Sequence, residues 1–132
     1  MHLIIRRLLK LFNTYSVIYQ GVGVSNNQFY SGASGRNAWR VRAGIKDKYG
    51  KIFTTLLLAS KIPKMQEYAL LIFYNNKQDS DNVVGGTVKL FLDSFKMKWA
   101  PDDSPKYCKL VAGIYDPTLT KGTMEFIIIK LK

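Results

Sequence analysis

Cysteine and histidine are almost absent from this sequence of 132 residues. It contains one cysteine, Cys108, and one histidine, His2. A disulfide framework and a zinc site built from cysteine and histidine are therefore excluded. A Ser-His-Asp or Cys-His catalytic group would have to use His2 near the terminus, so this kind of catalysis is not expected. We expect Cys108 to be a small apolar residue of a strand in a reducing cytoplasm.

Long apolar runs are also missing. No segment approaches the roughly 18 apolar residues of a transmembrane helix, and no membrane partner is expected. The first twelve residues, MHLIIRRLLKLF, are interrupted by Arg6, Arg7 and Lys10, and no small-residue cleavage site follows, so a secretory signal fits poorly. The spacing predicts a basic amphipathic helix, or a strand that begins the sheet. We expect residues 1–13 to form an N-terminal extension and residues 14–132 to form one domain.

Acidic residues are few, and they are concentrated. The chain has nine Asp and Glu against twenty Lys and Arg, which gives a net charge of +11. Charge alone favours nucleic acid or an anionic membrane surface as a partner, and of these we expect nucleic acid. Five of the nine acidic residues lie between Asp79 and Asp103. Neighbouring carboxylates stay ionised together when a cation holds them, since like charges raise a pKa. Mg²⁺, or Mn²⁺ in its place, suits such a site. We therefore expect a metal-dependent phosphodiesterase that acts on nucleic acid.

The hydrophobic pattern predicts an α+β domain, in which helices pack on a mixed β-sheet in the order β-α-β-α-β-β. Strands are expected over 14–20, 68–74, 106–115 and 124–131, and helices over 37–56 and 88–97. The apolar run of 68–74 indicates a central strand covered on both faces. Gly50 is where the first helix is expected to kink or divide. The basic residues expected to hold phosphates are Arg36, Arg40, Lys46, Lys48 and Lys51, with Lys106 and Lys109 near the third strand.

Asp79 and Asp81 flank one residue, so in an extended strand end both carboxylates point to the same side. The N-terminal dipole of the following helix would help to keep them ionised. Asp102 and Asp103, at the start of the next strand, are expected to meet this pair across the sheet edge. Three or four carboxylates around one or two Mg²⁺ ions position water and stabilise the leaving group of a phosphodiester. Lys89 is expected to stabilise the charge of the transition state.

A structural interpretation accounts for the same residues. Asp79–Asn82 and Asp102–Asp103 can be polar turns, one of which caps a helix, and Lys89 with Asp93 can be a helix ion pair. The protein would then be a non-catalytic basic DNA-binding protein. An EF-hand is excluded because Val84 stands where that motif requires glycine.

These motifs in this order resemble the RusA family of Holliday-junction resolvases, small homodimeric Mg²⁺-dependent endonucleases often carried by phages and prophages. The matching segments are 25–30, 79–82, Lys89 with Asp93, and Trp99 followed by 102–104. The resemblance implies a homodimer whose two sites cleave opposite strands of a four-way DNA junction symmetrically. It implies Asp79, Asp81 and Asp103 as metal-binding and catalytic carboxylates, Lys89 as the catalytic lysine, Asn82, Asp93 and Asp102 as supporting residues, and Asn26 and Asn27 as DNA contacts. A nuclease for other branched DNA, such as flaps, is a further alternative.

The spacing before Lys89 departs from the family. Six residues, 83–88, separate Asn82 from Lys89, more than in the shortest family members. If these extra residues are helical, Lys89 keeps its face but moves about 6 Å along the axis. Alternatively Gly85 and Gly86 form a looped insertion and the helix starts near Thr87. Because glycine has a low helix propensity, we expect the loop.

Overall fold

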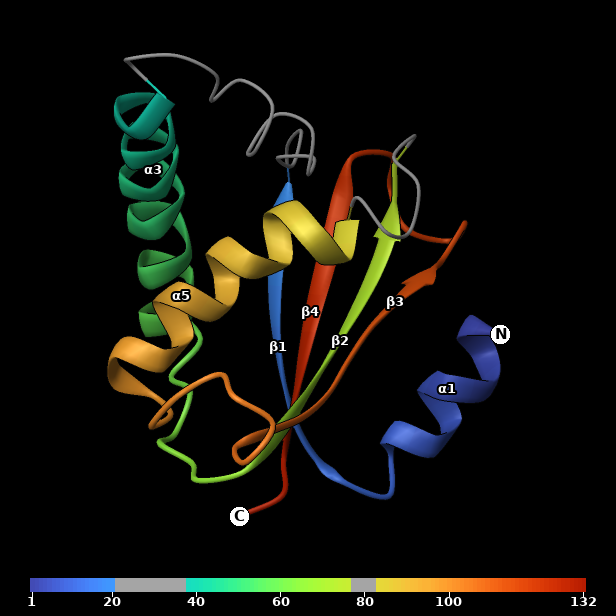
Figure 1. The fold of residues 1–132 in the computed structure, drawn as a ribbon. Coiled ribbons are helices and arrows are strands. Elements are labelled where there is room, and N and C mark those ends of the chain that lie inside the picture. Colours follow the sequence, from blue (N-terminus) through green and yellow to red (C-terminus); the bar gives the residue numbers. More distant parts are fainter. Residues whose placement is uncertain (21–37, 77–82) are drawn as a thin grey trace.

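A four-stranded mixed sheet lies at the centre of the computed structural model (Figure 1), which describes residues 1–20, 38–76 and 83–132. Its strand order is β1-β4-β2-β3. β4 runs antiparallel to β1 and β2, whereas β2 and β3 are parallel. The bounds are Asn13–Gln20 for β1, Tyr68–Asn75 for β2, Cys108–Tyr115 for β3 and Thr123–Lys130 for β4. The predicted α+β class with a mixed sheet is confirmed.

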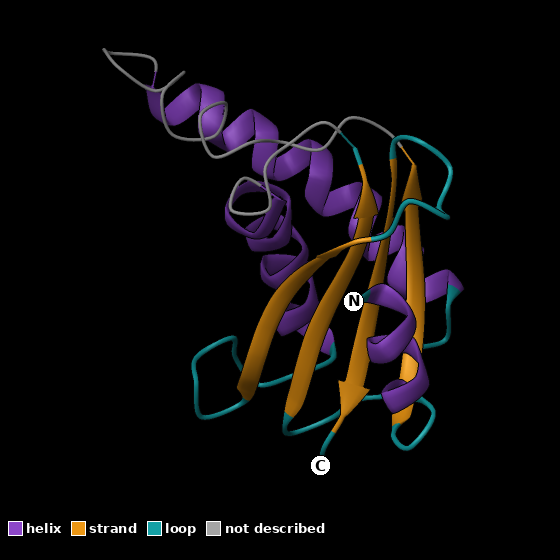
Figure 2. Cartoon of the chain, turned by 90° about the vertical axis from the view of Figure 1, so that its right-hand side faces the viewer, coloured by secondary structure: helices purple, strands orange, loops and turns teal. Residues whose placement is uncertain are grey.

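Helices cover both faces of this sheet. α3 (Ala38–Ala59), the π-helical turn η2 (Val83–Thr87) and α5 (Val88–Lys98) lie on one face. α1 (His2–Leu9) lies against the other face (Figure 2). Of the two structures expected for the first twelve residues, the helix is confirmed, while the domain boundary at residue 13 stays a prediction. Within residues 1–20, 38–76 and 83–132, no helix is long and apolar enough to span a bilayer.

β2 is buried on both faces, as its continuous apolar run predicts. Tyr68, Leu70, Ile72 and Tyr74 point into the larger core, which α3 and α5 cover. The alternate residues of the strand point to the opposite side, where Ile5 and Leu9 of α1 pack against a smaller core: Ala69, Leu71 and Phe73 of β2 with Ile114, Ile127 and Ile129. α1 therefore closes a second hydrophobic layer.

The predicted division of a helix at Gly50 and the predicted loop at Gly85–Gly86 are wrong, whereas a kink at Gly50 stays a prediction. α3 runs unbroken through Gly50, where it packs closely on α5: the Ser94 hydroxyl donates to the Gly50 carbonyl at 3.5 Å. Gly85 and Gly86 do not form a loop, because they lie in η2, which leads directly into α5. Gly86 is buried, and a helical turn supplies hydrogen bonds to backbone groups that a buried loop would leave unpaired.

Candidate functional site

Several of the predicted site residues lie outside the described residues, and their roles stay predictions. The structure places the described residues on both sides of one such segment, 77–82. Residues 77–82 follow the end of β2, and Val83 begins η2 directly after them. The predicted site residues in question are Asp79, Asp81 and Asn82 in this segment, and Asn26, Asn27 and Arg36 in 21–37.

α5 carries Lys89 and Asp93 on partly exposed positions. Asp93 pairs with Lys96, with Nζ to Oδ1 at 3.4 Å. No carboxylate of the described residues pairs with Lys89. The interpretation of Lys89 and Asp93 as a helix ion pair is therefore wrong, and the ammonium group of Lys89 is open to another anion.

Lys96 also ties the second acidic pair to α5. Its Nζ lies 3.8 Å from Oδ2 of Asp103. Partial burial alone would lower the pKa of Lys96, but the charges of Asp103 and Asp93 outweigh burial and raise it. Asp103, Asp93 and Lys96 thus form one ionic cluster at the C-terminal half of α5.

Asp102 is held in a turn beside this cluster. A hydrogen bond from the Asp103 backbone, with a further one from the Ser104 side chain, lowers the pKa of its carboxyl group. The backbone of Asp102 is fixed as well, since the Tyr68 hydroxyl donates to its carbonyl at 3.1 Å. Burial raises the pKa of Tyr68, which keeps this hydroxyl a donor. The Asp102 carboxylate therefore stays ionised.

The two acidic segments are connected to opposite ends of the parallel pair β2 and β3. Asp102 and Asp103 precede β3, at the end of the sheet where Tyr68 pairs with Cys108. Residues 77–82 follow β2 at its other end, where Tyr74 pairs with Tyr115. The seven residue steps of β2 separate these ends by about 23 Å. The predicted meeting of Asp79 and Asp81 with Asp102 and Asp103 involves residues outside the described part. A shared site requires 77–82 to approach the C-terminal half of α5, where Asp103 lies.

The predicted basic face of α3 is exposed to solvent. Lys51 pairs with Asp47 one turn earlier, with Nζ to Oδ2 at 3.2 Å, and both side chains are largely exposed. Such surface pairs are weak, so they leave the charge accessible to a polyanion. The exposed basic residues on this helix are Arg40, Lys46, Lys48 and Lys51.

Lys106 and Lys109 lie apart from the α3 face. α3 contacts β1, whereas Lys109 belongs to β3 at the opposite edge of the sheet. Lys109 is also partly neutralised, because its Nζ lies 3.2 Å from Oε1 of Glu67. The Lys106 ammonium lies 5.4 Å from the centroid of the neighbouring Tyr107 ring. The structure therefore does not bring the two predicted phosphate-binding groups together.

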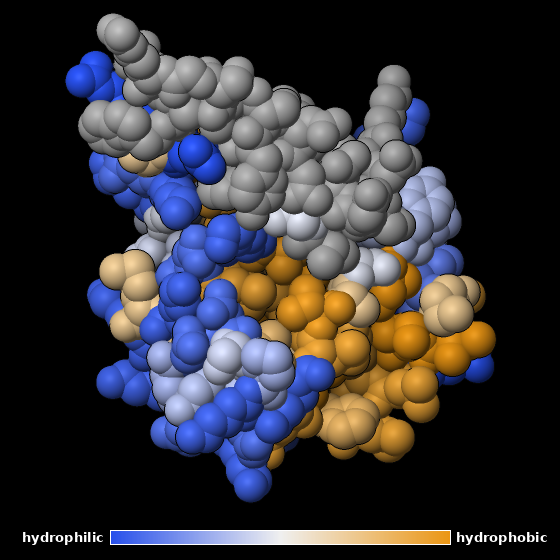
Figure 3. Space-filling view, in the orientation of Figure 1, coloured by the Kyte–Doolittle hydropathy of each residue, from blue (hydrophilic) through white to orange (hydrophobic). Residues whose placement is uncertain are grey.

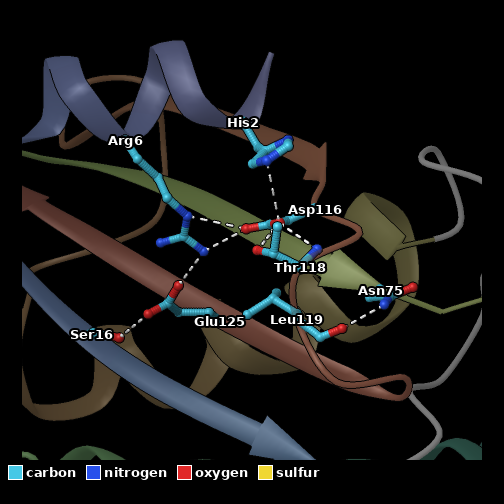
Figure 4. Close-up of polar contacts among 8 residues, drawn as sticks. All are labelled: His2, Arg6, Ser16, Asn75, Asp116, Thr118, Leu119 and Glu125. Atoms are coloured by element: carbon cyan, nitrogen blue, oxygen red, sulfur yellow. Dashed lines mark hydrogen bonds and ion pairs between the residues drawn. The ribbon is translucent and has the colours of Figure 1, made fainter.

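The sequence did not reveal an ionic cluster between α1 and the sheet (Figure 4). Arg6 donates from Nε and Nη2 to Oδ2 of Asp116, at 3.1 and 2.8 Å, and its Nη2 lies 2.8 Å from Oε1 of Glu125. Asp116 is fully buried and also accepts from the backbone and the hydroxyl of Thr118. Burial alone would raise the pKa of Asp116, but the bonds from Thr118 and Arg6 lower it.

This cluster fixes α1 on the sheet. His2 completes it, with Nε2 3.7 Å from Oδ1 of Asp116, and the Arg6 guanidinium lies 4.1 Å from the centroid of the Phe73 ring. One sequence signal was present: Arg6 lies on the same face of the helix as His2 and next to the inward-facing Ile5. An arginine on that face requires a buried anion, but the sequence does not say which one.

An exposed apolar surface, the α1–β3 groove, lies beside this cluster. A hollow of about 450 Å³ opens between α1 and the sheet, and Figure 3 shows hydrophobic side chains gathered on this side of the molecule. Several of its residues are about half exposed, namely Leu8, Phe12 and Leu110 at 51%, 52% and 51%. Apolar patches of this kind commonly mark protein interfaces.

The donors available for a metal are oxygen atoms. Within the part of the chain that the structure describes, no three Asp, Glu, His or Cys side chains gather closely enough to hold an ion. The carboxylate oxygens of Asp102 and Asp103 are ligands of the type that Mg²⁺ prefers. No protein-family model matches this sequence, and no curated protein does either.

Proposed function

We propose that the protein is an Mg²⁺-dependent endonuclease of the cytoplasm that cleaves branched DNA, with the four-way junction as its substrate. The observation that carries this proposal is the contact of Lys96 with Asp103 at 3.8 Å. It ties the acidic pair 102–103 to α5, the helix that η2 connects directly to 77–82. The two acidic segments are therefore linked through one helix. The net charge of +11 supports a polyanionic substrate.

In this proposal Asp79, Asp81 and Asp103 hold the metal, which supplies Lewis-acid catalysis and an activated water when bound. Lys89 neutralises the charge that develops on the phosphate. Its ammonium group suits this role because no described carboxylate is paired with it. Asn82, Asp93 and Asp102 support the site through hydrogen bonds and charge.

Replacing Asp81 with asparagine tests the mechanism. We expect Asp81→Asn to abolish junction cleavage in Mg²⁺ while junction binding in EDTA is retained, because the phosphate contacts remain. Asp47→Asn is the matched control, since Asp47 is exposed and, among the described residues, its ion-pair partner is Lys51; this variant removes a carboxylate but no lysine, so it keeps at least the cleavage of the wild type. Undiminished cleavage by Asp81→Asn refutes the mechanism.

The place of Asp103 in the site has its own test. The thirteen residue steps of helix from Val83 to Lys96 correspond to about 20 Å along the axis. Asp103 therefore shares a metal with Asp81 only if residues 77–82 approach the C-terminal half of α5. Mn²⁺ broadens NMR signals close to it. We expect the amide signals of Asp103 and Asp93 to broaden at low Mn²⁺ concentration, and this broadening to disappear in Asp81→Asn. Unbroadened signals contradict the assignment of Asp103.

We also propose a homodimer, because symmetric cleavage of a junction requires two active sites. The α1–β3 groove supports this proposal, since it exposes apolar side chains over a hollow of about 450 Å³. Leu8→Glu is expected to convert the dimer to a monomer in light scattering after gel filtration. Leu58→Glu, at an equally exposed leucine (55%) of α3, leaves the dimer intact. A monomeric wild type refutes the proposal.

A non-catalytic DNA-binding protein is the second candidate. The turn around Asp102 favours it, since hydrogen bonds within the turn already occupy this carboxylate. Calorimetric titration of Mg²⁺ separates the two functions. The nuclease predicts binding heat that is lost in a triple Asp79, Asp81, Asp103→Asn variant, whereas the binding protein predicts equal heats for both.

A further inference from the structure

A hollow of about 330 Å³ opens where α5 ends beside the end of β4. Its floor contains the buried Trp99 and Met65, whose backbone amide donates to the Trp99 carbonyl at 2.8 Å. Lysines from three separate segments also line this hollow. They are Lys64 before β2, Lys98 at the end of α5, and Lys130 and Lys132 at the end of the chain. A rigid apolar floor thus carries a rim of positive charge.

Three carboxylates near this hollow already pair with lysines. Glu67 accepts from Lys109 and Lys132, at 3.2 and 3.4 Å, and the bond from Lys109 lowers the pKa of Glu67. Asp103 and Asp93 are matched by Lys96. Among the described residues, the other three lysines of the rim, Lys64, Lys98 and Lys130, form no ion pair. Their mutual repulsion favours binding of an anion.

A second hollow, of about 380 Å³, lies between α3 and α5 and includes Lys46 and Lys51. Met97 lines both hollows and is 78% exposed. The two basic hollows are therefore neighbours that one apolar side chain separates. Together they form a continuous surface, which we call the lysine track, from α3 across the end of α5 to the end of β4.

We propose that the lysine track binds successive phosphates along one strand of a nucleic acid. The proposal rests on the proposed function and extends it, since it assigns the path of the substrate to Lys64, Lys98 and Lys130. Lysines act as separate point charges for backbone phosphates. Their distribution over three segments fits a run of phosphates better than one compact anion. Met97 lies between them, where an apolar side chain can contact a sugar or a base.

Two other anions share this chemistry, but the structure favours them less. A site for free phosphate commonly uses the backbone amides of a helix N-terminus, whereas the hollow lies at the C-terminus of α5, where the dipole is negative. An anionic lipid surface would use exposed apolar side chains for insertion. The largest group of those lies on and beside α1, on the opposite face of the sheet from α5, whereas the track contributes Met97.

The test compares two triple variants that remove equal charge. The first replaces Lys64, Lys98 and Lys130 with glutamine, and the second replaces the exposed residues Lys10, Lys61 and Lys121, which lie outside both hollows. Affinity for a labelled four-way junction and a labelled single strand is measured in EDTA by anisotropy over a salt series. Each phosphate contact contributes about 0.9 to the slope of log affinity against log salt for duplex DNA. We expect the first variant to lose about 2.7 in slope for the junction and to bind at least about tenfold more weakly at ~0.1 M salt, while the control stays near wild type.

Each outcome decides the proposal. Equal affinity and slope in the two triple variants overturn the lysine track but leave the proposed function standing, provided that the wild type binds DNA. A wild type that does not bind DNA overturns both. The first variant can also lose binding to vesicles of phosphatidylserine and phosphatidylcholine, or to inorganic phosphate, while it keeps binding to DNA. In that case the track is reassigned to that anion and the proposal fails.

A single substitution keeps the proposal testable if the triple variant does not fold, which its melting temperature shows. Met97→Glu places a carboxylate between the two hollows, so we expect it to weaken DNA binding at least about fivefold through repulsion of phosphates. Leu58→Glu adds the same charge at a similarly exposed site of α3 that lines neither hollow. Equal binding by these two variants overturns the track.

Discussion

Replacing Arg6 with methionine tests whether the ionic cluster holds α1 on the sheet. The change removes the two hydrogen bonds to Asp116 and the contact with Glu125, while it keeps an unbranched apolar chain over the Phe73 ring. Asp116 is fully buried and would keep only Thr118 and a distant His2 as partners. Breaking a buried ion pair on one side costs about 3–5 kcal/mol. Because the Arg6 side chain is 33% exposed, we expect Arg6→Met to lower the free energy of unfolding by about 2–3 kcal/mol.

Urea unfolding followed by circular dichroism measures this loss, which corresponds to a melting temperature lower by about 10 °C. Arg7→Met is the matched control, since Arg7 is exposed and has no carboxylate partner among the described residues; its effect stays within about 0.5 kcal/mol. In a double-mutant cycle, Arg6→Met and Asp116→Asn should couple by about 1–3 kcal/mol. Additive effects, or equal losses for Arg6→Met and Arg7→Met, refute the assigned role of the cluster.

Three further predictions follow from particular contacts. The pKa of Asp116 is lowered below its ordinary 3.8 by folding, so its charge stabilises the fold above that pH and this contribution is lost as pH falls below about 4; urea midpoints measured over a pH series should fall less steeply for Arg6→Met than for wild type. Gly50→Ala should stabilise the protein by about 0.5–1 kcal/mol, because among the described residues its Cβ would meet nothing nearer than Ser94 Oγ at 4.0 Å, and an unchanged or lower midpoint contradicts this. Gly122→Ala should destabilise it by about 1 kcal/mol, because φ is 82° there, and a rise in the urea midpoint is the contrary result.

The strands and the two long helices were predictable because their signals are strong within each segment. The apolar run of β2 indicates burial on both faces, and β2 is covered by both cores. Glycines were the exception. Local propensity predicted a break at Gly50 and a loop at Gly85–Gly86. Packing against α5 keeps Gly50 helical, and burial keeps Gly86 in a helical turn. The helix propensity of glycine costs about 1 kcal/mol, which is less than the free energy that packing and burial contribute.

The candidate site was less predictable, because side-chain partners far apart in the chain leave no local pattern. Arg6 and Asp116 are 110 residues apart, and neither residue type indicates the other. Lys96, which bridges Asp93 and Asp103, was likewise missed, because Lys89, four residues before Asp93, is also at helical spacing from it and spacing alone does not choose between the two lysines. The parallel pairing of β2 and β3 is also visible only in the sheet topology. It places the start of β3, after Asp102 and Asp103, at the opposite end of the sheet from the end of β2, and no local sequence pattern indicates this.

Cleavage of matched DNA substrates is the most direct test of the proposed nuclease. A four-way junction, a flap and a linear duplex of the same sequence are incubated with the protein and Mg²⁺, and the products of wild type and Asp81→Asn are compared. The proposal predicts paired, symmetric nicks in the junction, little cleavage of the linear duplex, and none of either by Asp81→Asn. Cleavage of the flap in preference to the junction would assign a different substrate. An intact junction with wild type in Mg²⁺ and in Mn²⁺ contradicts the nuclease itself.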